Sequence, residues 1–383
     1  MQTKKLNWRN VRRALGTLLL SAVLFTACSK KDNLASTQVP AEDESALVNE
    51  ASALEKTVAA EAETEGKKLG FSTGDLERGG RRTIVQIALG NANLSSLAAA
   101  VVKTGLAGAL TDASASLTVF APTNAAFAQL PAPFNNAANI ASISSTEQID
   151  FLRNVLLYHV LGAEVLSNQI ASGRSSAATL KPAGTANDNT VYISKTFGLI
   201  KLNGSTRVIY PNVNATNGVV HVIDKVLLFP TNTIAGIAIA NPNFSTLVAA
   251  LVKTNLAGVF GGSGDFTVFA PTNAAFAQLS APFNNADNIN AITDQGQIDA
   301  LANILKYHVT GSRYFSWDLG ILQRVSTIAS APNNKVTTIL GCNIGYVKGD
   351  ANNKFSKITP ADILATNGVI QVIDRVLLPR SNN

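Results

Sequence analysis

Three histidines and two cysteines are the residues of this 383-residue sequence best suited to acid–base, nucleophilic or metal chemistry. His159 and His308 each follow a tyrosine, and the apolar spacing before them predicts that both lie on the apolar side of a helix. A histidine in that setting is expected to be a core residue satisfied by a hydrogen bond. His221 is replaced by Gln371 in a second copy of its segment, and glutamine exchanges hydrogen bonds but carries no proton at neutral pH. The role shared at this position is therefore hydrogen bonding, which argues against histidine-based catalysis.

The sequence contains no motif typical of a metal site or of a nucleotide-binding site. No two histidines have the spacing of zinc ligands, and Cys342 has no partner if Cys28 is modified. The loop around Asp350 (KGDANN) resembles a calcium loop in composition but lacks the terminal bidentate glutamate. No G-x-S-x-G, phosphate-binding or dinucleotide-binding motif joins a strand to a helix. We therefore expect no catalytic residue, no metal and no cofactor, with an enzyme on this fold kept as an alternative.

The N-terminus predicts export and a lipid anchor. Residues 1–27 hold five basic residues and no acidic one, and the apolar run 14–27 is shorter than the ~20 residues of a membrane-spanning helix. This order is typical of a secretory signal peptide. The small residues before Cys28 resemble a bacterial lipoprotein box, in which the signal is cut before a lipidated cysteine; an ordinary secreted protein is the alternative. Because Ser29 is not an aspartate retention signal, we favour the outer membrane of a bacterial envelope, facing the periplasm or the surface.

The charge excludes a nucleic-acid partner. The formal net charge is +6, but without the five basic residues of the signal the chain has 26 basic and 25 acidic residues. A nearly neutral chain has no electrostatic footprint for a phosphate backbone.

An internal repeat sets the domain organisation. Thr118–Ile140 recurs at Thr267–Ile289 with 21 of 23 positions identical, and Ala215–Leu228 recurs at Ala365–Leu378 with 11 of 14 identical. A period near 150 residues is the length of a whole domain. We predict a lipoprotein signal peptide at 1–27, a tether at 28–81 that is partly helical or disordered, and domains at 82–230 and 231–380.

Each copy is predicted to be α+β, with helices first and paired strands after them. In the first copy the predicted elements are a helix at 94–106, a strand at 117–121 stopped by Pro122, a short helix at 125–130 capped by Thr123, a helix at 146–161 capped by Thr146, a hairpin at 190–209 with its turn at Asn203-Gly204, and a last strand at 219–228 after the Asn217-Gly218 turn.

Three blocks, each present twice and in the same order, resemble the fasciclin domain family. They are TVFAPTNAAF at 118–127 and 267–276, the pairs Tyr158-His159 and Tyr307-His308, and ATNGVVHVID and ATNGVIQVID at 215–224 and 365–374. The resemblance covers about 300 of the 383 residues. It implies a wedge of mostly antiparallel strands with a helical cluster, and a role in adhesion or extracellular matrix binding without catalysis.

The resemblance also implies candidate site residues. In animal members, adhesion to integrins is linked to the tyrosine-histidine region and to an Asp-Ile pair before the last block. Asp362-Ile363 matches that pair in the second copy, whereas Asn212-Val213 stands there in the first. Eight further residues of the blocks are expected to serve the architecture as caps and tight turns. They are Thr123, Asn124, Asn217 and Gly218 in the first copy, and Thr272, Asn273, Asn367 and Gly368 in the second.

We therefore predict a two-domain, lipid-anchored binding or adhesion module of the cell envelope. Its partner is an unidentified polysaccharide or protein of the envelope or extracellular space, and it touches the membrane through the lipid on Cys28. A passive structural spacer of the envelope is the alternative outside the enzyme class.

Overall fold

The computed structural model describes residues 64–71, 82–184, 187–196, 198–320, 322–340 and 345–380. They form two compact units: 64–71 and 82–232 with Leu364–Thr366, and 233–363 with 367–380. We call residues 82–232 the first domain and 233–380 the second domain. The predicted signal peptide, both cysteines and most of the predicted tether lie outside the described residues. Within the described part no single helix has the length and hydropathy to cross a membrane, although two bent helix pairs pass that test on length and composition.

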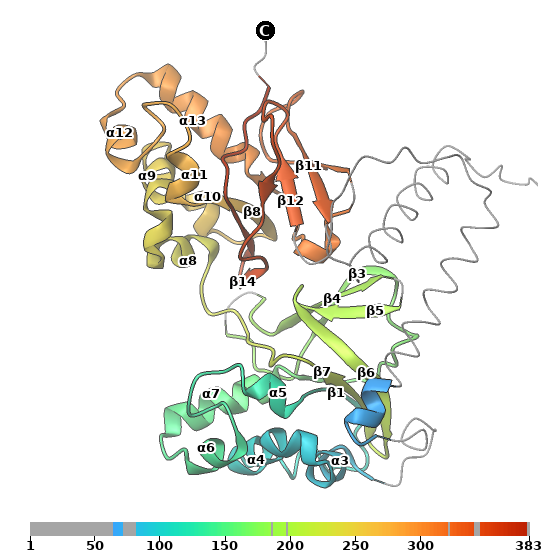
Figure 1. Ribbon diagram of the computed structural model, residues 1–383. Helices are drawn as coiled ribbons and strands as arrows, with labels where there is room; N and C mark the ends of the chain where they lie inside the picture. The colour runs from blue at the N-terminus through green and yellow to red at the C-terminus, as the bar shows by residue number, and fades with distance from the viewer. Residues whose placement is uncertain are drawn as a thin grey trace, which may run out of the picture. The chain divides into compact units, whose positions relative to one another are not determined.

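The first domain combines short helices with one sheet (Figure 1). The sheet has the strand order β2-β1-β7-β6-β5-β4-β3 and is antiparallel except for β1 and β7, which run parallel in the register Leu117↔Gly218. Its helices are α3 (Ile84–Gly90), α4 (Ser95–Lys103), α5 (Asn124–Phe127), α6 (Ala137–Ser142) and α7 (Thr146–Leu157), with a 3₁₀ turn at Ala92–Leu94. Its strands are β1 (Leu117–Pro122), β2 (Val160–Leu161), β3 (Gly173–Ala178), β4 (Thr190–Thr196), β5 (Leu199–Leu202), β6 (Thr206–Ala215) and β7 (Gly218–Ile223).

The second domain repeats this order with one break in the sheet. Pro360 takes the place of Tyr210, which pairs with Val222 in the middle of β6. Where β6 is continuous, the second domain has two short strands with Pro360 between them, and the sheet divides into β10-β11-β12-β13 and β14-β15-β8-β9. Its helices are α8 (Ile234–Ala240), α9 (Ser245–Lys253), α10 (Ala257–Gly261), α11 (Asn273–Phe276), α12 (Ala286–Ala291) and α13 (Gln295–Tyr307), with 3₁₀ turns at Pro242–Phe244 and Ser316–Asp318. Its strands are β8 (Phe266–Pro271), β9 (Val309–Thr310), β10 (Gln323–Ser326), β11 (Lys335–Leu340), β12 (Gly345–Lys348), β13 (Ser356–Lys357), β14 (Ile363–Ala365) and β15 (Gly368–Ile373).

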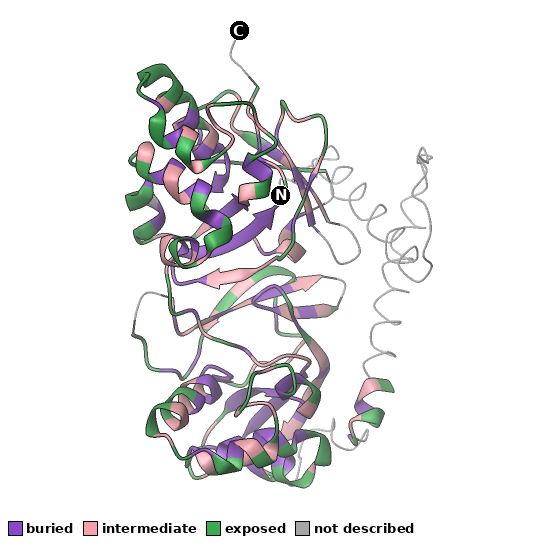
Figure 2. Ribbon diagram, turned by 60° about the vertical axis from the view of Figure 1, so that its left-hand side comes forward, coloured by how far each residue is buried: buried purple, intermediate pink, exposed green. Residues whose placement is uncertain are grey.

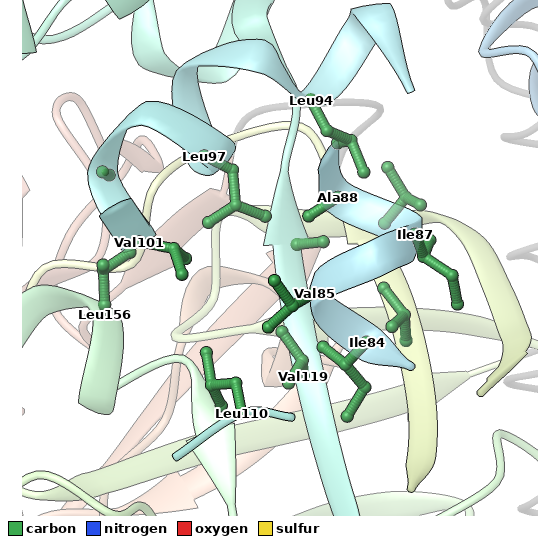
Figure 3. Packing of buried hydrophobic residues seen from close by; sticks show 14 of the residues in the cluster. Ile84, Val85, Ile87, Ala88, Leu94, Leu97, Val101, Leu110, Val119 and Leu156 are labelled. Carbon is green, nitrogen blue, oxygen red and sulfur yellow. The ribbon is translucent and has the colours of Figure 1, made fainter. Parts of the chain in front are cut away.

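The parallel pair of strands forms the centre of each domain. Every residue of β1 and β7 is buried, and in Figure 2 the buried residues line the sides of helices and strands that face one another. Figure 3 shows side chains of α3 and α4, among them Val85 and Leu97, gathered around Val119 of β1. Burying each such side chain stabilises the fold by about 1.5–3 kcal/mol. The predicted α+β layering is therefore present, with apolar strands packed beneath the helices.

Three predicted boundaries are wrong. The helix predicted at 146–161 is capped by Ser145, whose hydroxyl accepts the Gln148 N–H, and it ends at Leu157 because the next residues pair with β1 as β2. The last strand ends at Ile223 and not at residue 228. The predicted caps and turns at Thr123, Asn203-Gly204 and Asn217-Gly218 are present. The first arm of the hairpin predicted at 190–209 is instead two paired strands, β4 and β5, and α3, α6, β2 and β3 were not predicted.

Part of the predicted tether belongs to the first compact unit. Residues 64–68 are helical, and Phe71 is buried and stacks on Tyr210 with ring centroids 5.3 Å apart. The Asn91 amide donates to the Leu69 carbonyl at 2.8 Å. No pattern in the sequence indicates this contact, because Phe71 lies among glycines and charged residues.

Gly218 is required by the close approach of two strands. It has φ +141°, and a Cβ at this position would lie 2.0 Å from the Leu117 carbonyl oxygen. We expect Gly218→Ala to lower the free energy of unfolding by at least about 2 kcal/mol, because β1 would have to move away from β7. Denaturant unfolding followed by circular dichroism measures this. Gly108→Ala, where a Cβ meets no atom within 4 Å, is the control and should change stability by less than about 0.5 kcal/mol; equal effects would contradict the prediction.

Candidate functional site

The tyrosine of each tyrosine-histidine pair is buried at a helix end. Tyr158 is the C-cap of α7, and its hydroxyl donates to the Thr190 carbonyl at 2.6 Å and accepts from the Asn203 amide at 3.1 Å. Tyr307 likewise donates to the Lys335 carbonyl and accepts the Asp350 N–H. Both rings are completely buried, so these hydroxyls tie the helix to the strands and offer nothing to an outside partner.

The histidine of each pair was predicted to lie on the apolar face of a helix, but it lies just after the last residue of the helix. The Phe120 N–H donates to the His159 carbonyl at 2.9 Å, which draws the chain out of the helix and alongside β1. The imidazole turns back, with Nδ1 2.6 Å from the Val155 carbonyl, while Nε2 accepts the Leu227 N–H at 2.9 Å. His308 makes the equivalent contacts at 2.7 and 2.8 Å. Each ring therefore clamps the helix end to the chain that follows the last strand.

These contacts hold the clamp histidines neutral. A ring that faces one carbonyl and one N–H matches a neutral imidazole, because protonation would set two N–H groups against each other. Burial lowers the pKa of both His159 and His308 to about 4. Neither ring has a nitrogen left for a substrate.

His221 and Gln371 make the same two hydrogen bonds, as the sequence comparison predicted. His221 Nδ1 accepts the Asn212 N–H at 3.1 Å, and its Nε2 lies 2.9 Å from the Val165 carbonyl. Gln371 Oε1 accepts the Asp362 N–H at 3.1 Å, and its Nε2 donates to the Tyr314 carbonyl at 3.1 Å. Burial lowers the pKa of His221 to about 4. An amide thus replaces a neutral imidazole without loss of a partner.

Asp362, the acidic residue of the Asp-Ile pair, is engaged inside its own domain. Its carboxylate accepts the N–H and the hydroxyl of Ser316, both at 2.6 Å, and the Gln371 amide at 2.8 Å. Asn212 bonds the equivalent Ser167: its Oδ1 accepts the Ser167 N–H and its Nδ2 donates to the Ser167 hydroxyl, at 2.8 Å each. Asp362 has φ +62° and Asn212 φ +60°, a left-handed conformation that these two residue types tolerate. The acidic residue is therefore part of a loop clasp that asparagine forms equally well, and its neighbour Ile363 begins β14.

The remaining block residues form hydrogen bonds with backbone groups at the starts of helices and in loops. Asn217 accepts the Ile84 N–H at 3.0 Å and donates to the carbonyls of Leu110 and Asp112. Asn367 repeats this pattern on Ile234, Phe260 and Gly262. Asn124 and Asn273 each accept an N–H from the first turn of α4 or α9, and Thr123 and Thr272 cap α5 and α11. Gly368 brings β15 close to Phe266 as Gly218 does for β7.

One pair of site residues was not singled out from the sequence. The Thr118 hydroxyl, fully buried, donates to the Ala163 carbonyl at 2.7 Å and accepts the Val165 N–H at 2.8 Å. Thr267 does the same with Ser312 and Tyr314. The same threonine stands at this position in both copies of the repeated block, which could have indicated its role. Threonine is common in strands for its β propensity alone, so the residue was not singled out.

No arrangement in the described part of the chain favours metal binding. Among those residues, no three histidine, cysteine, aspartate or glutamate side chains lie together in a way that could hold a metal ion.

Comparison with known proteins identifies the same two domains as the repeated blocks. The family model described as Fasciclin domain matches residues 92–229 and 242–379. Transforming growth factor-beta-induced protein ig-h3 of Sus scrofa is 32% identical over 268 residues, which are 70% of this chain and 35% of the relative. Protein sll1483 of Synechocystis is 37% identical over 149 residues, 38% of this chain and 73% of the relative.

A solved structure, a FAS1 domain pair from the insect cell adhesion molecule Fasciclin I, has 19% identity and a TM-score of 0.35. It covers 75% of this chain and 97% of that one. This chain spans about a third of the length of the two mammalian ig-h3 proteins and of human periostin, which it matches.

The equivalence of His221 and Gln371 predicts the effect of two substitutions at neutral pH. His221→Gln should leave the free energy of unfolding within about 0.5 kcal/mol of wild type, because the amide keeps both backbone partners. His221→Leu should cost about 1–3 kcal/mol, because the Asn212 N–H and the Val165 carbonyl lose their partner. Denaturant unfolding of the full chain compares the three proteins. A large loss for glutamine would mean that the imidazole itself is needed.

The low histidine pKa values predict a selective loss of stability in acid. Below about pH 6.5 the histidines of the unfolded chain bind protons, whereas the native rings stay neutral down to about pH 4. The free energy of unfolding is therefore highest above pH 6.5 and falls between pH 6.5 and about pH 4. Each ring accounts for up to about 3 kcal/mol. The first domain contains His159 and His221 and the second only His308, so the first should lose more.

Hydrogen exchange between pH 7 and 5, resolved by domain, measures this difference. His221→Gln should make the two domains respond alike. An unchanged difference between the domains in that variant would contradict the assignment.

Proposed function

Because the chain belongs to the fasciclin domain family and carries the domain twice, we propose that it is a non-enzymatic binding or adhesion module of a bacterial cell envelope. The observation that carries the proposal is the tandem match, in which both copies retain all three blocks. Adhesion is the role that this resemblance implies. Similarity to the Synechocystis relative supports a bacterial setting.

The histidine geometry argues against the enzyme alternative. His159, His221 and His308 use both ring nitrogens on backbone groups of their own domain. A general base needs a nitrogen within hydrogen-bond reach of the proton that it removes. In these three rings both nitrogens are already engaged in hydrogen bonds that stabilise the fold.

The same reasoning moves the proposed binding surface away from the family blocks. The tyrosine-histidine pairs are buried, and the Asp362 carboxylate already accepts three hydrogen bonds. A partner that used either group would have to break the clamp or the clasp. We therefore propose that ligands bind to the outer surface of the domains, where the two copies differ in sequence.

The proposal includes a lipid anchor on Cys28 and attachment to the outer membrane. It rests on the basic start, the apolar run and the small residues before this cysteine, and on Ser29 after it. Such an anchor would hold two folded domains at the envelope.

The anchor predicts a simple labelling result in a bacterial host. The wild-type chain should incorporate labelled palmitate, Cys28→Ala should not, and Cys342→Ala, the matched control, should remain labelled. Ser29→Asp should shift the protein toward the inner membrane on a density gradient. An unlabelled wild-type protein, or a mature chain that begins elsewhere, would contradict the anchor.

The binding role is tested separately with the purified chain on arrays of envelope polysaccharides and extracellular proteins. Saturable binding to a defined ligand is expected. Silent arrays would favour the passive spacer, and turnover of an arrayed substrate would favour the enzyme.

A further inference from the structure

The second domain has a groove between α13 and residues 378–380. Its volume is about 540 Å³, and its apolar part is formed by Ala300 and Ile304 of α13 with Leu378 and Pro379. Asn303, Ser330, Asn333, Ala351 and Arg380 complete the lining, and four of these five have polar side chains. The residues of the family blocks are not among those that line it.

The first domain carries aromatic rings at the equivalent positions. Leu227 and Leu377 both donate to a clamp histidine, which aligns Phe229 with Pro379, and the aligned helices match Phe151 with Ala300. Phe151 and Phe229 contact each other with ring centroids 5.8 Å apart.

Other residues surround these rings. Phe229 also meets Tyr158 edge-on at 6.1 Å, and the Lys181 ammonium lies 4.8 Å from the centre of its ring. Phe151 meets Phe134 at 5.5 Å. The first domain thus shows what this position of the fold accommodates: phenyl rings, one of them with an ammonium group over its face.

The second domain lacks two phenyl groups at this position and keeps the surrounding fold. Alanine and proline take the place of the two phenylalanines, while Tyr307 retains the position of Tyr158. A cavity of ~150 Å³ is enough to hold a benzene ring. A groove of about 540 Å³ can therefore receive an aromatic side chain together with part of the chain that presents it.

We propose that this groove binds an aromatic side chain of a partner protein, next to an acidic residue that pairs with Arg380. Arg380 is exposed and is the charged residue among those that line the groove. An aromatic anchor in a pocket with a charged rim is typical of the residues that dominate protein interfaces. The proposal rests on the binding role proposed above and assigns that role to one face of the second domain.

A side chain of a partner fits better than a whole small molecule. Sites for small molecules enclose most of the ligand, whereas Ala300, Asn303, Ala351 and Arg380 of this groove are exposed. In the first domain, moreover, the rings at this position are presented by a polypeptide. The N-terminal residues 28–63 contain no phenylalanine, tyrosine or tryptophan, so that part of the chain cannot supply the ring.

Short peptides and methyl NMR of the full chain test the proposal. Acetyl-Phe-Asp amide should shift the Ile304 methyl signals in a saturable way, acetyl-Ala-Asp amide should not, and acetyl-Phe-Asn amide should bind more weakly. Arg380→Gln should abolish the preference for aspartate over asparagine while the ring still binds.

Filling the groove supplies the decisive variant. Ala300→Phe with Pro379→Phe copies the first domain and should weaken peptide binding at least about tenfold. Val252→Phe, which adds a ring to an exposed residue of α9 outside the groove, is the control and should have no effect. Trp317 fluorescence reports whether the second domain is folded, and Ala300→Phe alone replaces the double variant if that protein does not fold.

Absence of Ile304 shifts with every peptide, or undiminished binding in the filled variant, overturns the groove assignment. Arrays that still capture the full chain would then leave the general binding role standing. Loss of array binding in the filled variant supports the groove as the site of that role.

Discussion

The architecture of each domain depends on satisfying backbone polar groups around a pair of fully buried parallel strands. Strands β1 and β7 expose no face to water, so backbone groups beside them need partners within the protein. A buried N–H or carbonyl without a partner costs about 1–3 kcal/mol. His159, Asn217 and Thr118 supply those partners from positions far apart in the chain. This requirement explains why the family blocks contain polar residues within apolar strands.

The duplication shows which property of these side chains matters. His221 and Gln371 differ in their capacity to carry a proton, and Asn212 and Asp362 differ in charge, yet each pair bonds equivalent groups. What the two copies share is the set of backbone groups that these side chains bond. An acidic residue linked to adhesion in animal relatives is therefore a loop clasp in this chain, which directs attention to the outer surface for recognition.

The two copies preserve one framework and differ where the framework permits it. Phe151 and Phe229 pack together in the first domain, whereas Ala300 and Pro379 border a groove in the second. Such changes leave the clamp and the parallel strands intact, because the clamp uses backbone partners that do not depend on the neighbouring side chain. Duplication followed by surface divergence gives one chain two faces on the same fold.

The sequence by itself determined the duplication, the family, the α+β class, the caps at Thr123 and Thr272, and hydrogen bonding as the role of His221. These follow from local pattern and from comparing the copies. It could not determine that the helix ends at Leu157, that β1 pairs in parallel with β7, or that Phe71 packs on Tyr210. Each of these depends on segments distant in sequence, where the partner of a backbone group or ring decides the local conformation. The groove likewise required the tertiary structure, because an alanine on a helix reveals a missing ring only when its neighbours in space are known.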